Sequence, residues 1–227
     1  MIRICASITE SNIEDCLKAI SKAKELGARI VELRIDFLDN HEEISKIIQQ
    51  AKLPLIATNR SKKEGGEFEG NEEERINSLI NAIDDGCEFV DIELNTNKKL
   101  RGRVTNLARR NKCEVIVSIH DFKKTPNMKN LNKLLTEEKA IADIGKIVTF
   151  GNKNEDTIKI FNLLRIANSR NFPLITFAMG SLCSFSRIVA PLFGSYLTYV
   201  SVGKPSAIGQ MNIREMVNVY KQLGVKI

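Results

Sequence analysis

The sequence is poor in the features that mark several large classes of protein. Proline and glycine are sparse, with five and thirteen copies among 227 residues, which disfavours disordered and fibrous proteins. No apolar run approaches the roughly 18 residues that suggest a membrane span. Residues 1–8 alternate like a strand and lack the apolar core of a secretion signal. We therefore expect a globular, cytoplasmic protein with no membrane partner.

Cysteine and histidine are also scarce. The five cysteines include no Cys-x-x-Cys pair, and their odd number argues against a disulfide framework. Cys5, Cys87 and Cys113 lie in or beside expected strands, where they would be small buried side chains. The two histidines, His41 and His120, stand in no cluster with metal-ligand spacing. The sequence thus predicts no metal site.

Charge is not concentrated anywhere along the chain. The 34 lysines and arginines exceed the 28 aspartates and glutamates, and the net charge of +6 could suit an anionic partner such as nucleic acid. However, the lysine pairs at 62–63, 98–99 and 123–124 are short, and aromatic residues make up only 6% of the chain. Without a recognisable nucleic-acid-binding module, this charge indicates a solvated surface, and we expect no nucleic-acid partner.

What the sequence does contain is a regular alternation of strand and helix patterns. Short apolar or alternating runs predict eight strands, at residues 2–8, 29–36, 53–59, 87–94, 113–119, 144–150, 172–178 and 198–203. Amphipathic helical stretches lie between them, for example at 13–26, 42–51, 72–83 and 157–167.

This alternation favours an α/β fold, a single (β/α)8 TIM barrel over residues 1–227. Dividing 227 residues by eight gives about 28 per unit, enough for one strand, one helix and two short loops. A doubly wound sheet alternates in the same way. The count of eight strands, and the lack of a glycine-rich phosphate motif after the first of them, favour the barrel.

Lys146 lies inside the expected strand 144–150, which otherwise reads as buried. Desolvation there would disfavour the ammonium form and leave a neutral amine able to attack a carbonyl. The chemistry predicted is that of an imine-forming enzyme. A strand lysine can instead be paired with a carboxylate or extend to the mouth of a barrel.

Polar residues gather at the ends of the expected strands, where active sites of (β/α)8 barrels form. They are Glu32, Arg34 and Asp36 on one face of the second strand, Arg60 after the third, Asp91 and Glu93 in the fourth, Ser118 and His120 in the fifth, and Lys146 in the sixth. Each could be a structural salt bridge at the barrel mouth. Together they predict a polar pocket suited to proton transfer and imine chemistry on a hydroxylated anionic substrate, without a metal.

The local sequences around these residues resemble type I 3-dehydroquinate dehydratase, an enzyme family of the shikimate pathway of aromatic amino-acid biosynthesis. The similar segments cover nearly the whole chain: 32–36, 60–66, 118–122 with 125–126, Lys146, 179–180, 186–187 and 206–210. The resemblance implies a (β/α)8 barrel that uses no metal or organic cofactor. It also implies the conversion of 3-dehydroquinate to 3-dehydroshikimate and water.

The resemblance assigns three catalytic roles. Lys146 attacks the C3 ketone and forms an imine, or Schiff base, which makes the C2 proton acidic. His120 takes this proton and helps the C1 hydroxyl leave as water, in a syn elimination. Glu64 orients the histidine ring and favours its protonated state, although without the resemblance the sequence favours a solvent-exposed loop acid.

The resemblance also assigns seven substrate contacts: Arg187 to the carboxylate, Ser206 and Gln210 closing over the same end, Glu32, Arg34 and Arg60 to the ring hydroxyls, and Met179 as an apolar wall. Met179 could equally be ordinary core.

The loop 203–210 has a glycine near each end and could close over the site. Lys204 in that loop is the rival nucleophile, but a solvated lysine should remain charged.

Three residues depart from the family pattern: Asn59, Cys183 and Ile208. None replaces a reacting group, although Ile208 stands where a proline would stiffen the loop. Two other functions remain open: a class I aldolase, which also uses a barrel lysine, and a noncatalytic barrel that binds anionic metabolites or RNA.

Type I enzymes are often homodimers, and the same arrangement is expected here. The apolar stripe of residues 213–223 is either the dimer interface or the inward face of the last barrel helix.

Overall fold

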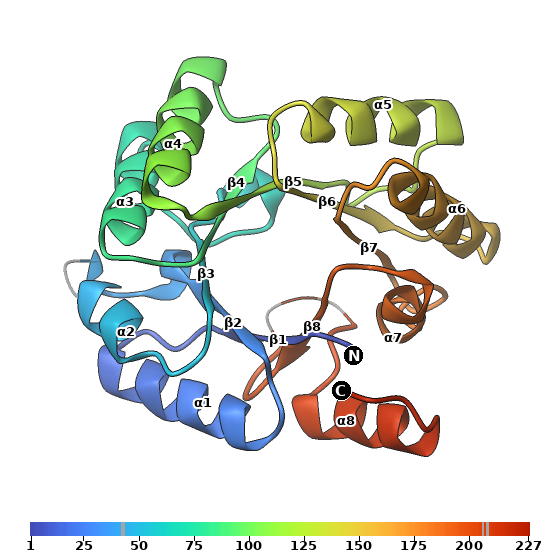
Figure 1. The fold of residues 1–227 in the computed structure, drawn as a ribbon, viewed down its shortest axis with the longest axis horizontal. Helices are drawn as coiled ribbons and strands as arrows, with labels where there is room; N and C mark the ends of the chain where they lie inside the picture. Colours follow the sequence, from blue (N-terminus) through green and yellow to red (C-terminus); the bar gives the residue numbers. More distant parts are fainter. Residues whose placement is uncertain (42–43, 206, 208) are drawn as a thin grey trace.

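Eight parallel strands curl into a barrel that is surrounded by helices (Figure 1). The computed structural model describes residues 1–41, 44–205, 207 and 209–227. The strands are β1 (Ile4–Ile8), β2 (Ile30–Arg34), β3 (Leu55–Thr58), β4 (Phe89–Glu93), β5 (Glu114–His120), β6 (Ile144–Phe150), β7 (Leu174–Met179) and β8 (Thr198–Ser201). Their order is β7-β6-β5-β4-β3-β2-β1-β8, so the predicted (β/α)8 barrel is confirmed.

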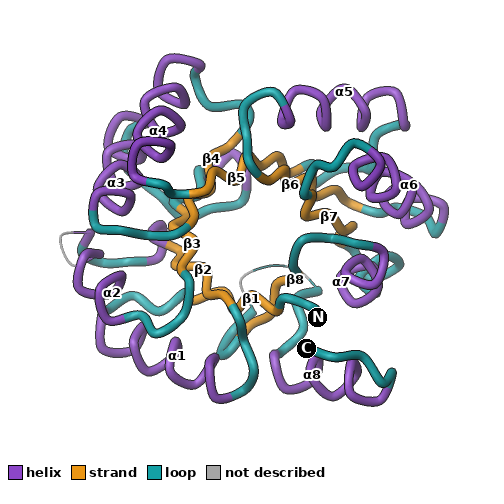
Figure 2. The backbone as a smooth tube through the Cα atoms, in the orientation of Figure 1, coloured by secondary structure: helices purple, strands orange, loops and turns teal. Residues whose placement is uncertain are grey.

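The first and last strands pair with each other, which bends the sheet round on itself. Ser7 of β1 is in register with Glu32 of β2 on one side and with Ser201 of β8 on the other. Between β7 and β8, the backbone N–H of Tyr196 donates to the carbonyl of Leu174 at 2.9 Å. Figure 2 shows the resulting ring of strands, with the helices outside it.

The helices begin and end as their sequences indicate. They are α1 (Ile13–Glu25), α2 (Ile44–Gln50), α3 (Glu72–Asp84), α4 (Lys98–Asn111), α5 (Met128–Lys139), α6 (Glu155–Ser169), α7 (Ser186–Val189) and α8 (Ile213–Gln222), with 3-10 turns η1 (Ile35–Phe37), η3 (Lys62–Glu64) and η4 (Ala190–Phe193). Asparagine side chains cap the N-termini of α1, α3, α4, α5 and α8, because the amide oxygen can accept from the free N–H groups of a first turn. Glu42, where the second helix was expected to begin, lies outside the described residues.

Six of the eight strands are shorter than the sequence predicts, and in β2 and β3 this changes the place of a site residue. β2 ends at Arg34, and Asp36 lies in the turn η1 rather than on the face of the strand. The reason is that the Asp36 carboxylate accepts hydrogen bonds from the Arg34 guanidinium at 2.6 and 2.9 Å and from the backbone N–H of Glu67 at 3.0 Å. β3 ends at Thr58, so Arg60 belongs to the loop that follows.

The interior of the barrel changes from apolar to polar along the strands. Near the N-terminal ends, an apolar cluster inside the barrel contains Cys5, Ile30, Ile56, Phe89, Ile116, Ile144 and Ile175. Two residues further along, the same inward faces carry Ser7, Glu32, Thr58, Asp91, Ser118, Lys146 and Phe177. Two further apolar clusters between strands and helices hold the outer layer in place. The polar half of the interior therefore faces the loops that follow the strands.

Among the described residues, no helix is both long enough and apolar enough to cross a membrane.

Candidate active site

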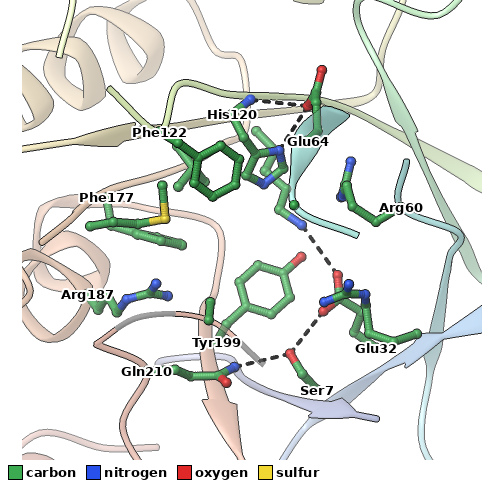
Figure 3. A pocket seen from close by; sticks show the side chains of 16 residues that line it. Ser7, Glu32, Arg60, Glu64, His120, Phe122, Phe177, Arg187, Tyr199 and Gln210 are labelled. Carbon is green, nitrogen blue, oxygen red and sulfur yellow. Dashed lines mark hydrogen bonds and ion pairs between the residues drawn. The ribbon is translucent and has the colours of Figure 1, made fainter. Parts of the chain in front are cut away.

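A cavity of about 240 Å³ opens at the C-terminal ends of the strands (Figure 3). It brings together nine of the ten site residues that the sequence suggested: Lys146, His120, Glu64, Glu32, Arg34, Arg60, Met179, Arg187 and Gln210. The tenth, Ser206, lies outside the described residues, as does Ile208. The fold thus gathers side chains from seven strands or their following loops into one pocket.

Lys146 lies at the bottom of this pocket and is 4% exposed. Its Nζ is 2.8 Å from Asp91 Oδ2 and 3.3 Å from Glu32 Oε1. The sequence left open whether this lysine is paired with a carboxylate, and the structure pairs it with two. The lysine is therefore both buried and paired.

Asp91 is held by a second cation as well. Arg60 Nη2 lies 2.8 Å from Asp91 Oδ2, and the Ser118 hydroxyl donates to Asp91 Oδ1 at 2.6 Å. Burial alone would raise the pKa of Asp91, but Arg60 and Lys146 hold it well below its ordinary value. Asp91 therefore remains a carboxylate and fixes the two cations at the floor of the site.

Glu32 connects Lys146 to the opposite side of the barrel. Its carboxylate accepts from Ser7 Oγ at 2.9 Å and from Thr58 Oγ1 at 3.1 Å, and Gln210 Nε2 donates to Ser7 Oγ at 3.3 Å. The sequence interpretation did not include Ser7. Its position two residues after the inward-facing Cys5, at the end of the first strand, was the signal that could have identified it.

His120 and Glu64 form a pair on another wall. His120 Nδ1 lies 3.0 Å from Glu64 Oε2, the backbone N–H of His120 donates to the same oxygen at 3.2 Å, and Asn95 Nδ2 donates to Oε1 at 3.2 Å. Glu64 is 7% exposed, so it is not a solvated loop acid. The sequence interpretation missed Asn95, which lies in the loop after the fourth strand.

The electrostatic surroundings of this pair favour a neutral imidazole. Burial raises the pKa of Glu64 to about 7, against the lowering effect of Arg60. Burial, with Arg60 and Lys146 nearby, lowers the pKa of His120 well below its ordinary value of 6.5. The expectation that Glu64 keeps the ring protonated is therefore opposed by the cations around it. A neutral ring is the form that accepts a proton.

Arg187 enters the pocket from the first turn of α7, opposite Glu32 (Figure 3). It is 2% exposed, and its guanidinium carbon lies 3.9 Å from the centre of the Phe177 ring. Burial lowers the pKa of Arg187 to about 10, which still leaves it charged near neutrality. The turn is fixed because the hydroxyl of Ser186 accepts from the backbone N–H of Ala178 at 2.9 Å.

The loop 203–210 was expected to contain a rival nucleophile, Lys204, and a residue that closes over the site, Gln210. Both of these residues lie in its described part. Lys204 is exposed, which is the solvated position expected for the rival nucleophile. Gln210 is 8% exposed and lines the pocket, and Ala207 also reaches it. Gly209 has a φ of +70°, a conformation that favours glycine, and a Cβ there would lie 3.2 Å from Ser184.

The remaining wall is mainly apolar. Phe122, Val148, Phe177 and Tyr199 line the cavity together with Met179, which is 3% exposed. Among them, the sequence interpretation assigned a substrate contact only to Met179. Phe177 precedes Met179 by two residues on the same strand face, and this period of two was the available signal.

The fold and the pocket are those of a (β/α)8-barrel enzyme. At the C-terminal mouth of the barrel lie a buried lysine, a histidine–glutamate pair and an arginine. A family model described as type I 3-dehydroquinase matches residues 4–227. The chain belongs to that family, and it is a hydro-lyase.

Individual relatives agree with this assignment over the full length. The 3-dehydroquinate dehydratase of Methanothermobacter thermautotrophicus is 36% identical over 213 residues, covering 93% of this chain and 92% of the relative. That of Methanocaldococcus jannaschii is 36% identical over 231 residues, covering 98% and 100%. The crystal structure of type I 3-dehydroquinate dehydratase from Clostridium difficile matches with a TM-score of 0.89 and 27% identity, covering 98% of this chain and 92% of that one.

Proposed function

We propose that this chain, acting as one catalytic domain over residues 1–227, converts 3-dehydroquinate to 3-dehydroshikimate by syn elimination through an imine on Lys146. The relatives named above are 3-dehydroquinate dehydratases. The single observation that carries the mechanism is the position of Lys146, with its amine buried inside the pocket and facing the substrate space. The remaining roles follow from what surrounds this amine.

Lys146 would act as the nucleophile. After its ammonium loses a proton, the nitrogen attacks the C3 ketone, and loss of water gives a protonated imine. This cation draws electrons from C2 and makes the C2 proton acidic. Asp91 and Glu32, which pair with Lys146 in the structure, would offset the positive charge that the protonated imine retains.

His120 would move the protons of the elimination. Its neutral ring can take the C2 proton, and the imidazolium so formed can give a proton to the departing C1 hydroxyl. Glu64, bonded to Nδ1, fixes the ring orientation and leaves Nε2 for the substrate. One imidazole serving both positions places them on the same face of the ring, which is a syn elimination.

The other predicted residues would bind the substrate. Arg187 is suited to the carboxylate because a guanidinium offers two parallel donors. Gln210 and Ser206 would close over that end. Glu32, Arg34 and Arg60 would contact the ring hydroxyls, with Met179 as an apolar wall. Arg34 and Arg60 are already held by Asp36 and Asp91, so they are preorganised for this role.

The test is to trap the imine. Incubation with 3-dehydroquinate and borohydride, followed by peptide mapping, should give a reduced adduct on Lys146 and on no other lysine. The exposed Lys204 is the internal control, because a nonspecific reaction with ketone would label it first. Product formation without any adduct on Lys146 would contradict the imine route.

The same experiment with sugar phosphates addresses the aldolase alternative. An adduct and carbon–carbon cleavage with a sugar phosphate, and neither with 3-dehydroquinate, would assign the lysine to an aldolase. Binding of anions that disappears with added salt and survives loss of Lys146 would instead support the noncatalytic barrel.

We also infer that the chain works in the cytoplasm as a homodimer, with no cofactor and no nucleic-acid or membrane partner. All five cysteines are buried free thiols, as expected in a reducing compartment. The apolar stripe of α8 packs inward, since Ile213, Met216 and Tyr220 are fully buried. That stripe is therefore not available as an interface.

The exposed apolar side chains lie elsewhere and supply the surface for a second copy. Among the described residues, five of the eight exposed large hydrophobic side chains lie on α6, η4 and the segment between β7 and α7: Ile158, Leu182, Phe185, Leu192 and Phe193. Phe193 stacks on Phe161 of α6, with ring centres 4.7 Å apart. Such apolar surfaces are typical of subunit interfaces.

Replacing Phe193 with glutamate is expected to convert the dimer to a monomer, because it places a charge in an apolar interface. Sedimentation equilibrium measures this directly. Leu223→Glu is the matched control, since Leu223 is 57% exposed at the end of α8. A Phe193→Glu protein with the same mass in solution as the Leu223→Glu control would contradict the proposed interface.

A further inference from the structure

Tyr199 has a hydroxyl group whose role the proposed mechanism does not explain. The residue lies on the inward face of β8, lines the pocket and is 4% exposed. Its Oη is buried and has no hydrogen-bond partner among the described residues. Buried hydroxyls in native proteins nearly always have a partner, so one without a partner among the described residues calls for an explanation.

The Tyr199 ring lies next to the amine of Lys146. Lys146 Nζ lies 4.4 Å from the centre of the Tyr199 ring. The strand fixes the backbone at this position, because Tyr199 is in register with Cys5 of β1. Figure 3 shows the side chain extending from β8 with its hydroxyl directed toward the centre of the pocket. A ligand bound to Lys146 would therefore place its nearest atoms beside the phenol.

The surroundings keep this group a hydrogen-bond donor. Burial raises the pKa of Tyr199 well above its ordinary value of 10.0, and the neighbouring carboxylate of Glu32 adds to the shift. The phenol is therefore neutral throughout the range in which proteins are stable. The Glu32 carboxylate accepts from Ser7, Thr58 and Lys146, and the phenol makes no hydrogen bond to it, so the phenol proton remains for another acceptor.

We propose that Tyr199 is a further catalytic residue, whose hydroxyl donates a hydrogen bond to the oxygen on the carbon that Lys146 attacks. This inference rests on the imine mechanism proposed above. During attack, the nitrogen lone pair forms the C–N bond and the carbonyl π electrons move onto that oxygen, where charge develops. A preorganised donor stabilises such charge more in the transition state than in the ketone.

The same donor would assist the second half of imine formation. The oxygen takes one proton from the attacking nitrogen to give the carbinolamine. It then takes the proton that Lys146 released before attack and leaves as water, while the nitrogen lone pair forms the C=N bond. Overall, one ammonium and one ketone give one protonated imine and one water. Tyr199 keeps its own proton throughout.

Tyr199→Phe removes the hydroxyl and keeps the aromatic ring with its contact to Lys146. It therefore tests the role of the hydroxyl alone. Rapid mixing with 3-dehydroquinate, quenching with borohydride at successive times and mass analysis gives the rate of imine formation. We expect this rate to fall by about 10- to 100-fold. The melting temperature should be unchanged or higher, because the variant removes an unpaired buried group.

Tyr220→Phe is the matched control. Tyr220 is fully buried in α8, outside the pocket, and its hydroxyl donates to the carbonyl of Ile188 at 2.8 Å. This variant should lose stability and keep the wild-type rate of imine formation, which is the reverse of the pattern expected for Tyr199→Phe.

The outcomes distinguish this inference from the mechanism on which it rests. If the wild-type protein forms the adduct and Tyr199→Phe forms it equally fast, the role of the hydroxyl is overturned and the imine mechanism stands. If Tyr199→Phe loses rate and melting temperature together, the hydroxyl is structural and the inference is also overturned. If the wild-type protein makes product without an adduct, the imine mechanism fails and this role fails with it.

Discussion

Lys146→Arg is expected to lower kcat for 3-dehydroquinate by at least about 10⁴-fold, because the proposed covalent mechanism would lose its nucleophile. Arginine keeps a positive charge next to Asp91 and Glu32, but its guanidinium does not deprotonate to attack a ketone. The measurement is the initial rate of product formation, together with the absence of a borohydride adduct.

Two further variants locate this effect in the chemistry rather than in folding. Lys146→Met removes the charge as well and leaves two carboxylates in a buried site without their shared cation, which should cost about 3–5 kcal/mol of stability. Lys204→Arg changes an exposed lysine of the pocket loop and should leave both kcat and stability near wild type. If Lys146→Arg retained substantial activity while Lys204→Arg lost it, the nucleophile would be the loop lysine.

His120→Gln is expected to lower kcat by about 10³-fold, because the elimination loses its proton acceptor and donor. The borohydride adduct on Lys146 should still form, since the amine and its carboxylate partners are unchanged. The adduct should carry substrate rather than product. Single-turnover trapping followed by mass analysis separates the two, which differ by one water. An adduct composed mainly of product in this variant would exclude His120 as the proton-transfer group.

His120 and Glu64 should have opposite effects on how the free energy of unfolding depends on pH. The pKa of Glu64 is about 7 in the folded protein and 4.5 as an ordinary value, so its contribution is fully present below pH 4.5 and is lost as the pH rises through 7. The pKa of His120 is lowered on folding, so its contribution is present above pH 6.5 and is lost as the pH falls. In the wild-type protein the two effects offset each other.

Removing either partner exposes the effect of the other. Relative to wild type, Glu64→Gln should gain free energy of unfolding as the pH rises from 5 to 8, by about 3 kcal/mol at most. His120→Gln should instead lose it over the same interval. Denaturant unfolding at each pH provides these differences. Parallel curves for both variants and wild type would mean that the pair does not titrate in this range.

Arg60 and Asp91 contribute to the preorganisation of the site more than to its stability. Both are almost completely buried, and Arg60 also lies 3.4 Å from Glu93. Buried ion pairs of this kind contribute little net stability compared with apolar packing. Here they hold Lys146 and the loop after β3 in fixed positions. This is the arrangement that a reacting amine requires, because small displacements of a nucleophile have large effects on rate.

The sequence by itself determined which side chains point into the barrel. The period of two along each strand placed Ile144, Lys146 and Val148 on one face, and the structure has them in that arrangement. Strand periodicity and family motifs are local patterns, so they can be read without knowing what lies across the barrel. For the same reason the sequence identified nine of the residues that line the cavity.

Only the tertiary structure decided what these side chains meet. Lys146 pairs with Asp91, 55 residues away, and with Glu32, 114 residues away, and neither contact follows from a pattern along one strand. The shift in the pKa of Glu64 depends on burial by segments distant in sequence. The Tyr199 hydroxyl, which has no partner in the described part of the chain, also owes its surroundings to the closed barrel. Register and curvature of the sheet set these distances, and both arise from the packing of all eight strands together.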